Sequence, residues 1–201
     1  LTVDLEDILP LMTKWYDNYR FSKNAAQSLF NTDMVLYLID NIIEAGKIPE
    51  QLIDHNVRID YGKLRYLVME ARKLNGNFEK MRNLISGESP YVTVAQSFPA
   101  EKVADENNFY SLLYYFGLLT YQNPKIKAGN LIIPNQTVRQ LMYGYLREAL
   151  DETIHFKVDL DLLTKELHNM AYHGQWRGFF DFVADRIKKH TVIRDYLSGE
   201  K

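Results

Sequence analysis

The sequence predicts a mainly α-helical protein with a winged-helix-like module that contains one small antiparallel β-hairpin, followed by a helical hairpin. Apolar residues recur three and four positions apart in several segments, which is the spacing of one face of an α-helix. Residues that cap helices stand before these segments, and glycines stand after them. Between two of the segments, two runs of β-forming residues flank turn-forming residues, which indicates a hairpin.

The first part of the chain is expected to consist of helices. Thr2 is a candidate N-cap for the opening helix, whose first turn is acidic. Thr32 or Asp33 is expected to cap a second, strongly apolar helix. Asp60 is a candidate cap for a third helix over residues 61–74, which the following Asn-Gly pair would close. Helices therefore fill most of this region in the prediction.

A short helix and a short strand are expected next. Apolar residues at helical spacing over residues 78–85 predict the helix, which would end before Gly87. Residues 91–94 are rich in β-forming side chains, so they are a candidate third strand beside the hairpin. A third strand of this kind is typical of a winged helix.

The hairpin is expected between two helices. The first of these helices has an apolar stripe that ends near Gly117. The strands are placed at residues 119–122 and 130–133, with Asn, Pro and Gly in the connection. Asn135 is expected to cap the second helix, which runs to Leu150. This order of elements predicts the winged-helix-like module.

Two further helices are expected to form the helical hairpin at the end of the chain. Asp159 is a good N-cap for the first of them, and Gly174 would end it. Large apolar residues at helical spacing over residues 176–187 predict the second. Because only a short turn separates the two helices, an antiparallel pair is expected.

Composition restricts the kinds of function. Apolar residues make up 46% of the 201 residues and charged residues 25%, as in an ordinary globular protein. The absence of cysteine excludes disulfides and a thiolate zinc site, and it fits the cytoplasm, where we expect the protein to reside. A net charge of −2 creates no general attraction to nucleic acid or membrane, and no apolar run reaches the roughly 18 residues of a membrane span. Since the first residue is Leu1 rather than Met, we expect a piece of a longer protein.

No catalytic or metal-binding motif is recognisable in the sequence. Neither of the glycine-rich phosphate-binding patterns, GxxxxGK[ST] and GxGxxG, occurs. His168 and His173 are five positions apart and would lie on different faces of a helix, whereas the zinc motif HExxH needs a spacing of four. We therefore expect this chain to hold no metal or cofactor and to catalyse no reaction.

Several segments together resemble the middle region of the bacterial AAA-ATPase-like family. They are residues 15–21 (WYDNYRF), 107–120 (NNFYSLLYYFGLLT), 133–135 (IPN) and 193–197 (IRDYL). Proteins of that family carry an N-terminal P-loop ATPase domain and often end in a domain similar to PD-(D/E)XK nucleases. The resemblance covers the whole chain, but the Walker A motif would lie before Leu1 and the nuclease carboxylates after Lys201.

The resemblance implies three regions and a connecting role. Residues 1–90 would be a helical, ATPase-lid-like region, residues 91–150 the winged-helix-like module, and residues 151–201 a helical hairpin that leads toward the absent nuclease-like domain. The chain would then be a non-catalytic lid and connector. Its partners would be its own ATPase and nuclease-like domains or other proteins. ATP and Mg²⁺ are expected only for the full-length protein, which the resemblance makes an ATPase.

A DNA-binding role for the winged-helix-like module is the alternative. Phosphate contacts supply most non-specific affinity for DNA, so exposed positive charge is needed on the wing and on the helix beside it. The wing offers Lys125 and Lys127, and the second helix offers Arg139 and Arg147. This is little charge, so protein contacts are favoured over DNA binding.

Arg20 is the candidate nucleotide-sensing residue. In ATPases related to the family, the lid supplies an arginine that reaches the nucleotide phosphates, and the planar guanidinium suits that task. The opposing interpretation is structural: Arg20 stacks on its aromatic neighbours or pairs with Asp17, three residues earlier. The structural role is favoured, because a cation among aromatic rings is already stabilised without a ligand.

Overall fold

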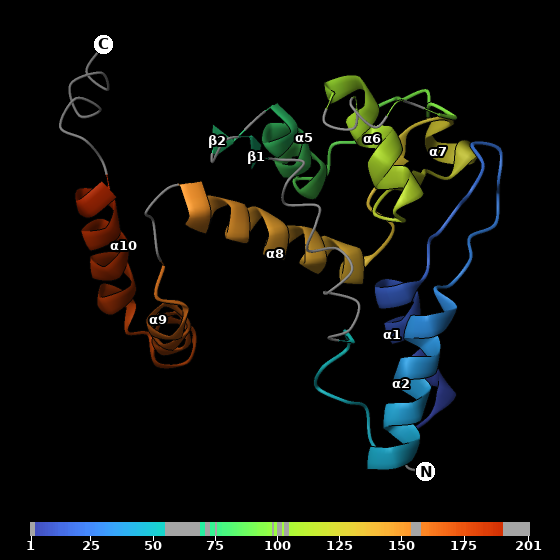
Figure 1. Cartoon of the computed structure of the whole chain (residues 1–201). Coiled ribbons are helices and arrows are strands. Elements are labelled where there is room, and N and C mark those ends of the chain that lie inside the picture. The colour runs from blue at the N-terminus through green and yellow to red at the C-terminus, as the bar shows by residue number, and fades with distance from the viewer. Residues whose placement is uncertain are drawn as a thin grey trace. The chain divides into compact units, whose positions relative to one another are not determined.

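The computed structural model confirms the mainly α-helical class (Figure 1). It describes residues 3–54, 69–70, 73–74, 76–97, 99, 102, 105–153 and 158–190. The chain divides into two compact units, Leu1–Thr153 and Ile154–Lys201. No helix among the described residues is long and apolar enough to cross a membrane.

The first unit holds most of the helices and all the described strands. Its described helices are α1 (Leu5–Tyr16), α2 (Thr32–Ala45), α5 (Gly76–Ile85), α6 (Glu106–Tyr115), α7 (Pro124–Lys127) and α8 (Gln136–Thr153). Its strands are β1 (Met69–Glu70), β2 (Lys73–Leu74), β3 (Thr120–Tyr121) and β4 (Leu131–Ile132). Helices α1 and α5 both pack against α8.

The caps of the first two helices differ from the sequence-based expectation. Thr2 lies outside the described residues, and Asp4 stands at the N-cap position of α1. Helix α2 is capped by Asn31, whose side chain accepts a hydrogen bond of 3.2 Å from the Met34 amide. Thr32 is already the first helical residue, so the assignment of the cap to Thr32 or Asp33 was wrong. A cap needs the extended backbone that Asn31 adopts.

The expected helix over residues 61–74 is wrong at its end. Strands β1 and β2 pair there as an antiparallel ladder, with Met69 opposite Leu74 and Glu70 opposite Lys73. Asp60, its candidate cap, lies outside the described residues. The next helix, α5, begins at Gly76, where the expected helix was to close. Helix α5 confirms the short helix expected over residues 78–85, and its apolar stripe is buried as that spacing predicts.

The hairpin forms as predicted, with a helical turn in its connection. Thr120 pairs with Ile132 and Tyr121 with Leu131. The short helix α7 occupies the connection and is capped by the side chain of Asn123. The candidate third strand is present as a single antiparallel bridge from Tyr91 to Asn130.

A hydrophobic core fills the space between α5, α6, the hairpin and α8. Its fully buried members are Met81, Phe109, Leu113, Leu118, Leu131, Met142 and Ala149. A smaller cluster joins α1 to α2 through Tyr16, Met34, Leu38 and Ile42. The Tyr16 hydroxyl donates a hydrogen bond of 2.8 Å to the Leu52 carbonyl, and burial raises the pKa of Tyr16 to about 12.

The described residues of the second unit form α9 (Leu160–His173) and α10 (Trp176–His190), which pack on each other. Asp159 caps α9 by accepting a hydrogen bond of 3.0 Å from the Leu162 amide, and Gly174 ends the helix in the left-handed region, as predicted. Figure 1 shows α9 along its axis and α10 from the side, so the two helices cross steeply rather than run antiparallel.

Candidate functional site

The segment at the end of α1 is hydrogen-bonded to the start of α8. We call this contact the junction; it joins residues 15–20 to Thr120 and residues 134–137. Its side-chain bonds run from Thr137 Oγ1 to the Trp15 carbonyl (2.7 Å), from Asn135 Nδ2 to the Asp17 carbonyl (3.0 Å) and from Asn18 Nδ2 to the Pro134 carbonyl (2.8 Å). Segments more than a hundred positions apart in the sequence are therefore held together.

Asn135 and Asn18 each have two tasks in the junction. Asn135 caps α8 by accepting a hydrogen bond of 3.2 Å from the Val138 amide, while its amide group donates to Asp17. Asn18 has a backbone φ of 83°, a left-handed conformation that asparagine tolerates better than most residues. Its side chain donates to Pro134 and accepts from the Arg20 guanidinium. Both side chains thus fix backbone geometry on two segments at once.

Arg20 is buried in the junction, with 8% of its surface exposed. Its amide donates a 2.6 Å hydrogen bond to Thr120 Oγ1, and that hydroxyl donates back to the Arg20 carbonyl at 3.0 Å. The Arg20 carbonyl also accepts from the Tyr121 amide at 3.3 Å, so this residue lies beside β3. Its guanidinium bonds the Asn18 side chain, and Asp17 instead accepts from the Ser28 hydroxyl at 3.2 Å.

The basic candidates for DNA contact lie in different settings. Lys125 and Lys127 are exposed on α7, in the hairpin connection. Arg139 is half-buried, and its guanidinium donates to the carbonyl of Ile85, the last residue of α5. A cation there also suits the negative end of the helix dipole. Arg147 is exposed on α8, about 12 Å further along the axis at a rise of about 1.5 Å per residue.

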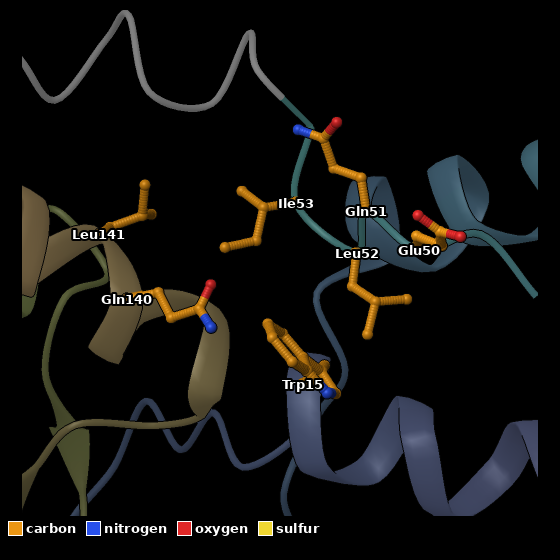
Figure 2. A pocket seen from close by; sticks show the side chains of 7 residues that line it. All are labelled: Trp15, Glu50, Gln51, Leu52, Ile53, Gln140 and Leu141. Atoms are coloured by element: carbon orange, nitrogen blue, oxygen red, sulfur yellow. The ribbon is translucent and has the colours of Figure 1, made fainter. Parts of the chain in front are cut away.

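A pocket of about 420 Å³ lies between the end of α1, the start of α8 and the segment after α2 (Figure 2). It is lined by Trp15, Glu50, Gln51, Leu52, Ile53, Gln140 and Leu141. In Figure 2, Ile53 projects into the space between Gln140 and Leu52, and Trp15 lies at its lower edge. The charged group among these lining residues is the carboxylate of Glu50, which repels phosphate rather than binding it.

A groove of about 460 Å³ lined by tyrosines lies on another part of the same unit, and we call it the tyrosine groove. The side chains and backbone that line it belong to Phe21, Ser22, Lys23, Tyr91, Val92, Thr93, Val94, Gln96, Tyr114, Tyr115, Tyr121 and Gly129. The Tyr114 hydroxyl donates to the Phe21 carbonyl at 2.9 Å, and the Tyr115 hydroxyl donates to the Ala95 carbonyl at 2.8 Å. These bonds hold both rings in place.

Two tyrosines of the groove, Tyr114 and Tyr121, have raised pKa values. Burial raises the pKa of Tyr114, and the neighbouring Tyr121 and Tyr115 raise it further. Burial likewise raises the pKa of Tyr121, with added contributions from Tyr115 and Tyr91. Each hydroxyl therefore remains a hydrogen-bond donor at and above neutral pH.

The sequence carried one signal of this groove. Adjacent residues of a helix point in directions about 100° apart, so Tyr114 and Tyr115 cannot both face the core. Residues 15–21 also contain four aromatic side chains, but nothing in their spacing shows which helix would meet Phe21.

The described residues contain no group of three or more His, Asp or Glu side chains that could hold a metal ion. The rings of His168 and His173 lie 5.7 Å apart, and both residues are exposed on α9.

No protein-family model matches the chain, and searches of curated proteins and of solved structures give no significant match.

Proposed function

We propose that this chain is a non-catalytic lid and connector of an AAA-ATPase-like cytoplasmic protein, acting through intramolecular or protein contacts. The junction is the observation that carries the proposal. It binds the segment after α1 to the first turn of α8 through partly buried hydrogen bonds, and to β3 through a buried one. Each such bond contributes about 1 kcal/mol, and leaving a buried partner unpaired costs more.

The junction makes the helical N-terminal region and the winged-helix-like module move together. The end of α1 could move relative to α8 only if its hydrogen bonds to Thr137 and Asn135 were broken. A connector requires this behaviour, because it transmits a movement only if its parts do not slide. In the longer protein, the movement would originate in the ATPase domain, which would bind the ATP and Mg²⁺.

Arg20 fits a structural role in this proposal before a sensing role. Its guanidinium is buried and bonded to Asn18, whose side chain also holds Pro134. A nucleotide phosphate could engage Arg20 only after that contact was broken and the side chain exposed. We therefore propose that Arg20 primarily shapes the junction, with contact to nucleotide in the longer protein as the secondary proposal.

Calorimetric titration of this chain with Mg-ATP is expected to show no binding tighter than about 1 mM, a standard free energy of roughly −4 kcal/mol. The reason is that the pocket beside the junction presents Glu50 and amides to a ligand, with no cation among the described lining residues. Measurable ATP hydrolysis, or a micromolar dissociation constant that Arg20→Ala abolishes, would contradict the connector proposal.

Duplex DNA binding is the second candidate, because Lys125 and Lys127 are exposed on the wing. Arg139 contributes little to it, since its guanidinium holds the end of α5. Fluorescence polarisation with a duplex of about 20 base pairs is expected to show a dissociation constant weaker than about 10⁻⁵ M near physiological salt, in the range of non-specific binding.

A matched pair of double variants makes this measurement decisive. Lys125→Ala/Lys127→Ala removes the wing charges, and Lys14→Ala/Lys165→Ala removes two exposed lysines from α1 and α9. Tighter binding that falls steeply with salt, and falls again in the wing variant alone, would reverse the order of the two candidates.

A further inference from the structure

A second hollow lies beside the tyrosine groove. That hollow has a volume of about 300 Å³ and is lined by Tyr19, Phe21, Phe30, Asn31, Tyr115, Phe116 and Gly117. Phe21 and Tyr115 line both spaces, so their rings separate two adjacent hollows. Exposed fractions of 66% for Phe21, 73% for Tyr91 and 53% for Tyr115 are high for aromatic side chains that lie together. Contiguous apolar surface of this kind marks an interaction site.

The rings are already held in place without a ligand. Tyr114 and Tyr115 use their hydroxyls to bond backbone carbonyls, and the Tyr114 ring meets Tyr115 and Tyr121 edge to face at centroid distances of 5.6 and 5.2 Å. Phe21 stacks on Tyr19 at 6.4 Å. Because these side chains lose little rotamer freedom on binding, the entropy cost of an encounter is low.

Rigid aromatic hollows fit a polyproline II helix. This conformation has three residues per turn and a rise of about 3.1 Å, so it presents side chains on one face about every 9 Å. Its backbone makes no internal hydrogen bonds, which leaves its carbonyls free to accept from donors such as tyrosine hydroxyls. Aromatic-lined grooves are a recurring way to bind such peptides. In the groove, Tyr91 and Tyr121 can supply these donors.

Charge selects among proline-containing peptides. Lys23 is the charged residue among those described as lining the groove, and no carboxylate accompanies it there. Lys125 and Lys127 are exposed on α7, in the connection between two residues that line the groove, Tyr121 and Gly129. We propose that the tyrosine groove and the hollow beside it bind a proline-containing peptide in the polyproline II conformation, with an acidic residue next to Lys23. This inference does not depend on the connector role.

The test uses defined peptides with the complete chain. The probes are decaproline with two aspartates at one end, the same peptide with two lysines, and an aspartate peptide in which alternate prolines are glycine. Calorimetry or tyrosine fluorescence is expected to give a dissociation constant between about 10⁻⁵ and 10⁻³ M for the acidic peptide, as for a small, shallow interface. The lysine peptide is expected to bind about threefold to tenfold more weakly at low salt, and the flexible glycine peptide more weakly still.

Side-chain variants locate the binding. Phe21→Ser and Tyr91→Ser each remove an exposed ring, and each is expected to weaken binding of the acidic peptide at least about fivefold, while the melting temperature stays within about 2 °C. Tyr172→Ser is the matched control, because Tyr172 is 75% exposed and lies on α9. Lys23→Glu is expected to reverse the preference between the acidic and the basic peptide.

The proposal is overturned by any of three results. One is the absence of binding to the acidic peptide at millimolar concentration. Another is binding that Phe21→Ser and Tyr91→Ser leave unchanged relative to Tyr172→Ser. The third is a preference for oligothymidylate over the acidic peptide at the same groove, which would make the rings a stacking platform for bases.

Discussion

Replacement of Phe109 by alanine is expected to lower the free energy of unfolding by about 3–5 kcal/mol. Phe109 is fully buried on α6, within the core formed with α5, α8 and the hairpin. Removing its ring takes away buried apolar surface and leaves a cavity that the surrounding helices can close only in part. Urea denaturation followed by circular dichroism measures the change.

Phe116→Ala is the matched control for this prediction. Phe116 follows α6 in the same apolar stripe but is 45% exposed. Its replacement is expected to cost less than about 1 kcal/mol, as for a surface change. An equal loss of stability in the two variants would contradict the burial of Phe109 in the core. A loss of stability in Phe116→Ala alone would mean that Phe116, and not Phe109, is the core residue.

Asn135→Ala is expected to lower the free energy of unfolding by about 2–4 kcal/mol. The cap of α8 accounts for about 1 kcal/mol. The lost bond to the Asp17 carbonyl, a partly buried acceptor that would then have no partner from Asn135, accounts for a further 1–3 kcal/mol or so. Because the junction joins two regions, the urea transition is also expected to broaden if they begin to unfold separately.

Two variants separate the components of the Asn135 effect. Asn135→Ser keeps an oxygen that can cap α8, so about 1 kcal/mol of stability is expected to return. Asn123→Ala removes the cap of the short helix α7, where the hydrogen bond of 3.0 Å from the Lys125 amide is exposed, and is expected to cost about 0.5–1 kcal/mol. If Asn135→Ala cost no more than Asn123→Ala, the junction would not hold the two regions together.

Local chemistry made much of the fold predictable from the sequence. The stripe that includes Phe109 and Leu113 indicated the buried face of α6, because residues four apart lie on one side of a helix. Asn135 and Asp159 were identified as caps, and Gly174 as a helix end, because those roles need only groups within one turn. Each of these assignments is confirmed.

The tertiary structure decided what depended on distant partners. Residues 69–74 were expected to end a helix, but Met69–Glu70 and Lys73–Leu74 pair as the strands β1 and β2. The sequence made Arg139 a candidate phosphate contact. In the structure its guanidinium donates to the carbonyl of Ile85, at the end of α5.

The junction and the tyrosine groove also depend on contacts between residues that are distant in the sequence. Asn135 reaches Asp17 across 118 positions, and Tyr114 reaches Phe21 across 93. Periodicity and capping depend on neighbours within one or two turns, so they show on which face of its helix a side chain lies. Which distant carbonyl its polar atom meets is determined only when the helices pack, since the bond then replaces one to water.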